Sequence, residues 1–174
     1  VLGTATTDSE GNFSVTPSAE LDEGNYSLEA KATDAAGNIS PESSSISITI
    51  DTTAPDAPTS LATTSSDTNN TTPTITGTAE ANSTITLLNG NIVLGTATTD
   101  SEGNFSVTPS ADLAEGNYSL EAKATDLAGN TSSESSSIPI IIDTTAPNAP
   151  SSLVDISATN DTTPTITGTA EANS

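Results

Sequence analysis

Tyr118-Ser-Leu-Glu-Ala-Lys-Ala124 decides the fold, because it is the clearest run in which apolar or small residues alternate with polar ones. Successive side chains of an extended strand point to opposite faces, so Tyr118, Leu120, Ala122 and Ala124 would share one face. A helix would need a period near 3.6 residues, and no stretch of this sequence follows one. The segment therefore predicts a β-strand buried on one side.

Six further short runs of this kind surround it, and turn sequences rich in Gly, Asn and Asp separate them. Asn89-Gly90 is typical of a two-residue hairpin. The predicted strands are 60–62, 74–79, 83–87, 92–98, 105–107, 118–124 and 137–142, with Ile75, Gly77, Ala79, Ile85, Leu87, Ile138, Ile140 and Ile142 facing the core. Seven antiparallel strands in about 90 residues predict an all-β fold, a two-sheet sandwich of immunoglobulin or fibronectin-III type.

Two residues support the sandwich. Tyr118 follows a Gly turn at the start of the sixth predicted strand, where such domains carry a tyrosine corner. Pro139 cannot donate to a sheet ladder, so we expect the last strand to lie at a sheet edge.

The chain contains an internal repeat. Residues 1–58 align with 93–150 at an offset of 92 (143 − 51) and differ only at positions 20, 22, 35, 39, 41, 47, 49 and 56. The proline-rich stretch Asp51-Thr-Thr-Ala-Pro-Asp-Ala-Pro58 returns at 143–150 and is predicted to be a short, stiff joint. We expect the back of one repeat plus its linker at 1–58, a complete repeat plus linker at 59–150, and the front of a third at 151–174. The chain is thus expected to be an excerpt of a longer array, with its two end fragments frayed or paired head to tail between molecules.

The composition excludes several classes of function. The formal charge is −21 over 174 residues, with two Lys and no Arg or His, which argues against nucleic acid or an anionic membrane surface as a partner. No apolar run approaches the roughly 20 residues of a membrane span. Without His or Cys, a Ser-His-Asp or Cys-His nucleophile and a usual zinc site are impossible, so we expect no enzymatic activity.

Five motifs occur in order along the complete repeat: Gly77-Thr-Ala-Glu80, Asp100-x-x-Gly-Asn-Phe105, Gly116-Asn-Tyr118, Ala124-Thr-Asp-x-Ala-Gly-Asn130 and Asp143-Thr-Thr-Ala-Pro147. Together they resemble the bacterial Ig-like tandem repeats in the extender regions of giant, type I-secreted biofilm-associated adhesins. The resemblance implies secreted, cell-surface spacer repeats that support adhesion and biofilm formation, with neighbouring repeats as partners and Ca²⁺ stiffening the joints. It implies nothing about the adhesion target.

Topology points to the same joints. In a seven-strand sandwich, the loops after the second, fourth and sixth strands lie at the pole that receives the preceding linker. Carboxylates crowded there would repel, and Ca²⁺, which takes six to eight oxygens, would relieve the repulsion. The predicted ligands are Asp51, Glu80, Asp100, Glu102, Asp126 and Asn130 at the first joint, Asp143 and Glu171 at the second, and Asp8, Glu10, Asp34 and Asn38 at the chain start.

Other interpretations stay open. The turns at Asp100 and Asp126 are equally typical of carboxylates that cap their own loops, and Asp51 and Asp143 could be solvated strand ends. Asp22, Glu23, Asp112 and Glu115 are expected at the opposite pole as solvated charges. A ligand-binding Ig-like module would need an exposed apolar or aromatic loop patch, which the sequence does not indicate, and accessory domains of a secreted enzyme are a further alternative.

Overall fold

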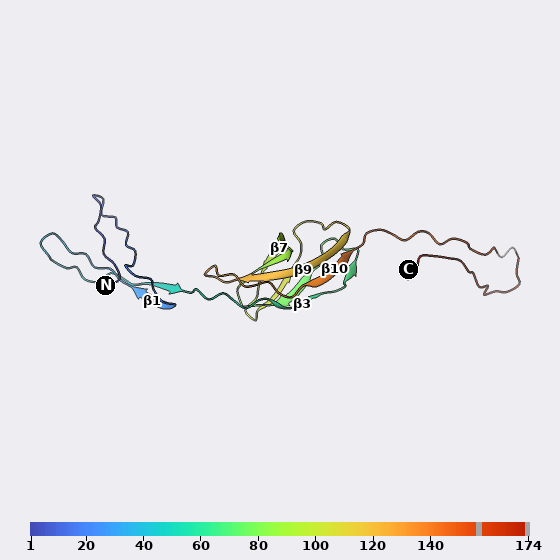
Figure 1. The fold of residues 1–174 in the computed structure, drawn as a ribbon, viewed down its shortest axis with the longest axis horizontal. Helices are drawn as coiled ribbons and strands as arrows, with labels where there is room; N and C mark the ends of the chain where they lie inside the picture. The colour runs from blue at the N-terminus through green and yellow to red at the C-terminus, as the bar shows by residue number, and fades with distance from the viewer. Residues whose placement is uncertain (156–157, 173–174) are drawn as a thin grey trace.

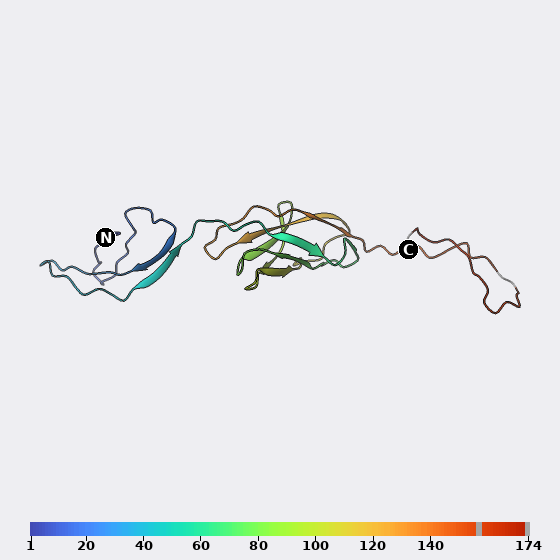
Figure 2. The same cartoon turned by 90° about the horizontal axis from the view of Figure 1, so that it is seen from below.

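A computed structural model describes residues 1–155 and 158–172. The chain is elongated, and its three parts succeed one another along the long axis in both views (Figures 1 and 2). A two-stranded N-terminal part comes first, a β-sandwich lies in the middle, and an extended C-terminal segment follows. Among the described residues there is no helix long and apolar enough to cross a membrane.

The sandwich has two sheets. One has the strand order β4-β10-β9-β6-β7 and the other has the order β3-β5-β8. Their bounds are β3 Thr59–Thr63, β4 Asp67–Thr68, β5 Ile75–Thr78, β6 Thr84–Asn89, β7 Ile92–Thr98, β8 Asn104–Val107, β9 Gly116–Thr125 and β10 Ile138–Ile142. All pairs are antiparallel except β4 with β10. The predicted all-β sandwich is confirmed.

All seven predicted strands are present, and β4 is an addition. Residues 65–70 are all polar and lie between two predicted strands, yet Asp67 and Thr68 run parallel to the end of β10. The Ile141 amide donates to the Ser66 carbonyl at 2.7 Å, and the Asp143 amide donates to the Thr68 carbonyl at 3.0 Å. Only this long-range pairing turns a polar loop into a strand.

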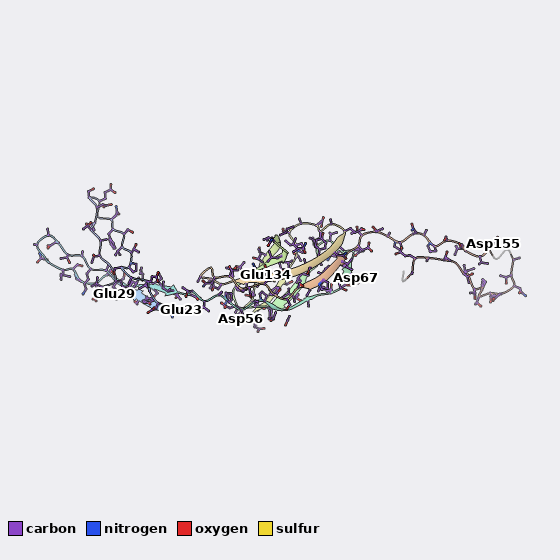
Figure 3. All side chains as sticks on the ribbon, viewed as in Figure 1. Glu23, Glu29, Asp56, Asp67, Glu134 and Asp155 are labelled. Atoms are coloured by element: carbon purple, nitrogen blue, oxygen red, sulfur yellow. The ribbon has the colours of Figure 1, made fainter. Side chains whose placement is uncertain are left out.

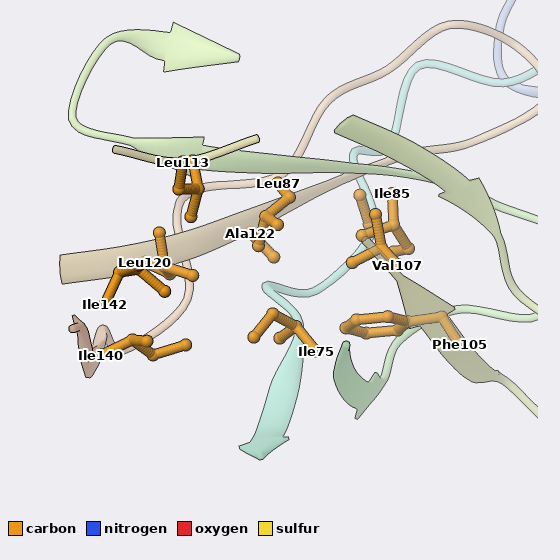
Figure 4. Packing of buried hydrophobic residues seen from close by; sticks show 11 residues of the cluster. Ile75, Ile85, Leu87, Phe105, Val107, Leu113, Leu120, Ala122, Ile140 and Ile142 are labelled. Atoms are coloured by element: carbon orange, nitrogen blue, oxygen red, sulfur yellow. The ribbon is translucent and has the colours of Figure 1, made fainter. Parts of the chain in front are cut away.

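The core lies between the two sheets and consists of small aliphatic side chains around one Phe (Figure 4). The alternation predicted for β6, β9 and β10 is confirmed, because their inward residues are buried: Ile85, Leu87, Leu120, Ala122, Ala124, Ile140 and Ile142. Ile75 of β5 and Val107 of β8 complete the opposite layer. Leu88 is also buried, although it pairs with Glu121 on the face opposite Leu87. The pairing of β6 with β7 shifts register between Leu87 and Leu88, and an alternating pattern does not predict such a bulge.

The predicted tyrosine corner is confirmed, since the Tyr118 hydroxyl donates to the Ala114 carbonyl at 2.9 Å. The repeat copy forms the same bond, from Tyr26 to the Asp22 carbonyl at 2.8 Å. The edge position predicted for the last strand is right only in part. Pro139 pairs with Ser119 on one side, while β4 covers Ile141 and Ile142 on the other.

The end fragments expose what the sandwich buries. In the N-terminal part, β1 (Gly24–Leu28) pairs antiparallel with β2 (Ile46–Ile50), as β9 pairs with β10. Phe13 is 58% exposed, whereas its copy Phe105 is 5% exposed. In the described part of the C-terminal segment, Ser151 forms a bridge with Thr169. Residues 156–157 and 173–174 of the predicted third repeat lie outside the described residues.

Candidate functional site at the joint between repeats

Three loops meet at the end of the sandwich that receives the preceding linker. Thr84, at the start of β6, pairs with Thr98 of β7 and Thr125 of β9, so the loops beside these residues lie together. The Ala79 amide donates to the Gly103 carbonyl at 2.9 Å and ties two of the loops to each other. One pole therefore carries the loops of Glu80, of Asp100 with Glu102, and of Asp126 with Asn130, as predicted from the antiparallel strand order.

A buried hydroxyl pair holds the loop of Glu80. Ser83 and Thr99 are both buried, and their hydroxyls donate to the Glu80 carbonyl at 2.7 and 2.6 Å. The Thr99 hydroxyl also accepts the Ser83 amide at 2.9 Å. The backbone of Glu80 is thus fixed while its side chain stays exposed at the joint.

The Asp residues of the turns are held by their own loops. Asp126 Oδ1 accepts the Gly129 and Asn130 amides at 2.7 and 2.8 Å, and Asn130 Nδ2 donates to Oδ2 at 2.8 Å. The Asn130 side chain, followed by the backbone amides, lowers the pKa of Asp126 despite some desolvation. Asp8, Asp34 and Asp100 each accept a main-chain and a side-chain bond from the Asn four residues later. The capping role that the sequence left open is present at all four turns.

The first joint is held by the sandwich that follows it. Asn130 Nδ2 also donates to the Asp51 carbonyl at 3.1 Å, across the boundary between repeats. Pro55 and Pro58 of the linker are buried. An open cavity of about 370 Å³ lies at this joint, with Glu23 and Asp51 lining it from the preceding repeat and Glu80 from the following one. Figure 3 shows Glu23 where the linker begins and Asp56 near the sandwich.

Glu23 and Glu115 have a role that the sequence did not predict. They were expected to be solvated, but Glu115 Oε2 accepts the Thr145 hydroxyl at 2.8 Å and the Thr144 hydroxyl at 3.0 Å. Glu23 accepts the Thr53 hydroxyl at 2.9 Å and the Thr52 hydroxyl at 3.0 Å. Gly116 pairs with Ile142, so the loop before β9 lies at the end where the linker leaves. The antiparallel pairing of these two strands could have indicated this position from the sequence, because it puts the loop before one strand beside the end of the other.

These hydroxyls also change the acidity of the two carboxyls. The Thr145 side chain, then the side chain and amide of Thr144, lower the pKa of Glu115. The Thr53 side chain, then that of Thr52, lower the pKa of Glu23. Both carboxylates, which are ionised at neutral pH, therefore stay ionised to a lower pH than an ordinary glutamate while they accept the threonine hydroxyls.

Within residues 151–155 and 158–172, which follow the second joint, the chain forms no sandwich. Asp143 Oδ1 accepts the Thr145 amide at 2.9 Å, and residues 143–150 are exposed. Glu171 is exposed near Thr169, which bridges to Ser151. Within residues 1–155 and 158–172, no three acidic side chains are gathered closely enough to hold a metal ion. The donor chemistry at the first joint suits Ca²⁺, and ion binding would have to draw the side chains together.

Fold and joints define the class: tandem Ig-like β-sandwich repeats on short, proline-rich linkers. The chain belongs to the bacterial Ig-like domain family, whose model matches residues 1–52 and 54–144. No curated protein matches it.

Several solved structures are similar to this chain. One is a tetra-tandem repeat from the extending region of a large adhesion protein, which is 27% identical and has a TM-score of 0.43. The match covers 82% of this chain and 42% of the adhesion-protein chain. The BSP domain of a biofilm-associated protein shares 25% identity over 84% of this chain and 23% of its own, with a TM-score of 0.38. The Clostridium thermocellum CbhA fibronectin(III)-like modules share 20% identity over 76% and 68%, with a TM-score of 0.44. This chain thus spans under half the length of the first.

Proposed function

We propose that these repeats are structural spacers in a bacterial cell-surface adhesin, holding another part of that protein away from the cell and so supporting adhesion and biofilm formation. Membership of the bacterial Ig-like domain family supports this proposal. The near-identity of the tandem repeats supports it as well, because a spacer needs length and the same unit supplies length each time it is copied. No catalytic role is proposed for a chain that has neither His nor Cys.

The main support for this proposal is the way the linker is held at the first joint. Asn130 donates to the Asp51 carbonyl across the boundary, and Pro55 and Pro58 are buried. A linker held in this way restricts the angle between two repeats, and proline removes much of the backbone freedom that remains. An array of such joints would be a stiff rod and would keep its tip extended.

We further propose that Ca²⁺ stiffens the joints. Glu23, Asp51 and Glu80 line one cavity there, and they supply the hard oxygen donors that Ca²⁺ prefers. Carboxylates from two repeats that share an ion would hold those repeats together, whereas without it they would repel. Asp100 and Asp126 already cap their own turns, so their part would be to shape the loops around the site.

The test is the melting temperature of the full chain in about 5 mM Ca²⁺ and in chelator. A site with a Kd of about 0.5 mM would add about 1.4 kcal/mol at that concentration, and the transition should rise by roughly 4–8 °C per kcal/mol. The rise should disappear in Asp51→Ala and Glu80→Ala. Asp56→Asn is the matched control, because the next copy of the linker carries Asn148 at this position.

If Ca²⁺ still raised the melting temperature of both Ala variants, the ion would bind at a site other than Asp51 and Glu80. No rise in the unmodified chain would leave a spacer whose joints do not use Ca²⁺.

A ligand-binding module is the alternative that one observation favours. Ile92 and Val93, neighbours at the β6–β7 hairpin, are 64% and 58% exposed, so the chain does carry an apolar pair at a loop. Binding to immobilised glycans or host matrix proteins that is lost in Ile92→Ser/Val93→Ser would support this function. Equal binding by the unmodified chain and by this double variant would count against a ligand-binding function.

A further inference from the structure

Both linkers are held by a carboxylate of the repeat they leave. Glu115 accepts both hydroxyls of the Thr144-Thr145 pair, and Glu23 accepts those of Thr52-Thr53. A second carboxylate supports each pair from the linker itself, since Asp143 and Asp51 accept the amides of Thr145 and Thr53 at 2.9 and 3.1 Å. We name these two arrangements the exit clamps.

The surroundings of the two exit clamps differ, but the clamps do not. At the first joint a complete sandwich follows and Pro55 and Pro58 are buried; at the second joint the copies Pro147 and Pro150 are exposed. The glutamate-to-threonine bonds form in both places. The exit clamp therefore depends only on the repeat that precedes the linker, whereas burial of the prolines depends on the repeat that follows.

Local geometry explains why the glutamate can reach. Glu115 precedes Gly116, which pairs with Ile142, the last residue of β10. Gly116 has φ +150°, a conformation that side-chain-bearing residues rarely adopt, and this lets the chain turn into β9 directly after Glu115. Gly24 has φ +145° beside Glu23. The glutamate thus stands at the sheet end from which the two threonines emerge.

We propose that Glu115 and Glu23 are positioning residues, which set the direction in which each linker leaves its repeat before any cation or following repeat acts on it. The inference rests on the proposed spacer function and deepens it. With Thr52 and Thr53 held by one repeat and both linker prolines, Pro55 and Pro58, buried, only Ala54 separates the exit clamp from the first buried proline.

The second joint is the place to test this, because a complete sandwich precedes it and its linker is otherwise exposed. The chain has no Cys, so Thr96→Cys on β7 and Asn148→Cys on the linker give a unique pair of spin labels. Pulsed electron paramagnetic resonance then measures the distance distribution between the labels in chelator. We expect a narrow distribution that widens at least twofold in Glu115→Ala and in Thr144→Val/Thr145→Val.

Glu102→Ala is the matched control, since this glutamate lies at the other pole and its carboxylate makes no hydrogen bond within the described residues. Thermal melts of each labelled variant verify that the sandwich is folded. An unchanged width in Glu115→Ala, or a wild-type distribution already as wide as that of the variants, would overturn the exit clamp.

A Ca²⁺ arm separates this inference from the proposed function. A narrow distribution in chelator that Ca²⁺ leaves unchanged supports the exit clamp without ionic stiffening at this joint. A wide distribution that narrows only with Ca²⁺ refutes the exit clamp and supports ionic stiffening.

Discussion

Single carboxylates in this protein have distinct tasks that their residue type does not reveal. Asp126 closes a turn, Glu115 holds a linker, and Glu80 lines the cavity at the joint. The difference lies in the donors nearby: the Asn130 side chain and backbone amides for Asp126, and threonine hydroxyls for Glu115. Each task therefore predicts its own response to pH or substitution.

Acid should weaken the turns. Hydrogen bonds lower the pKa of Asp126 below its ordinary value of 3.8, with the Asn130 side chain as the largest cause. The folded pKa thus lies below the unfolded one, so the contribution to stability is present above the unfolded value and is lost as the pH falls through the folded value. Urea unfolding between about pH 2 and pH 6 should show stability falling below about pH 4, and the fall should be shallower in Asp126→Asn. Equal slopes in both proteins would contradict this.

The buried hydroxyl pair at Glu80 makes a second prediction. Thr99→Val keeps the shape of the side chain but removes the acceptor of the Ser83 amide and a donor to the Glu80 carbonyl. The Ser83 hydroxyl and amide still donate to the Glu80 carbonyl, at 2.7 and 3.3 Å, so the variant loses hydrogen bonds but leaves no group without a partner. The expected loss is about 0.5–1.5 kcal/mol per bond, measurable by chemical denaturation. Thr98→Val is the control, because Thr98 is exposed on β7 and Val suits a strand. Similar losses in the two variants would show that the pair has no special role.

At the scale of elements, the sandwich depends on close contact between β5 and β8. Gly77 pairs with Phe105, and a methyl group on Gly77 would lie 2.6 Å from Phe105 Cζ. Phe105 is the one Phe of this core, so the glycine makes the room that its ring occupies. The sequence placed Gly77 on the inner face, and the structure supplies the reason for its size.

Gly77→Ala should therefore destabilise the sandwich by about 1–3 kcal/mol through overpacking. Phe105→Leu in the same chain should recover part of the loss, because the smaller side chain gives the methyl group space. Denaturant unfolding of the two single variants and the double variant forms a cycle that measures this coupling. Strict additivity would mean that the two side chains do not compete.

At the scale of the whole molecule, the chain carries the same strand in two environments. Gly24–Leu28 and Gly116–Leu120 have the same sequence, Gly-Asn-Tyr-Ser-Leu, but β1 pairs only with β2 while β9 lies between β10 and β6. Ile48 on β2 is 40% exposed, and its copy Ile140 is fully buried. The intrinsic strand propensity is equal in the two copies, so any difference in their burial or stability comes from tertiary contacts.

Amide hydrogen exchange should separate the copies. Amides of β9 should exchange orders of magnitude more slowly than the same residues of β1, because they open only when the sandwich unfolds. Exchange measured by NMR on the full chain checks this, and the shared sequence removes intrinsic rate differences. Matching protection would mean that the N-terminal part acquires a packed partner in solution, as the expected head-to-tail pairing of molecules would provide.

The sequence by itself determined the strands, the face each presents to the core, the tyrosine corner and the repeat, because these follow from alternation and turn chemistry within a few residues. It also indicated which loops share a pole, since antiparallel order alone sets that. Only the tertiary structure decided the bulge at Leu88, strand β4 and the exit clamps. The bond from Thr144 to Glu115 joins residues 29 positions apart, so it exists only once β9 and β10 are in register. A short-range pattern carries no information about such contacts, because their geometry is set by the pairing of whole strands.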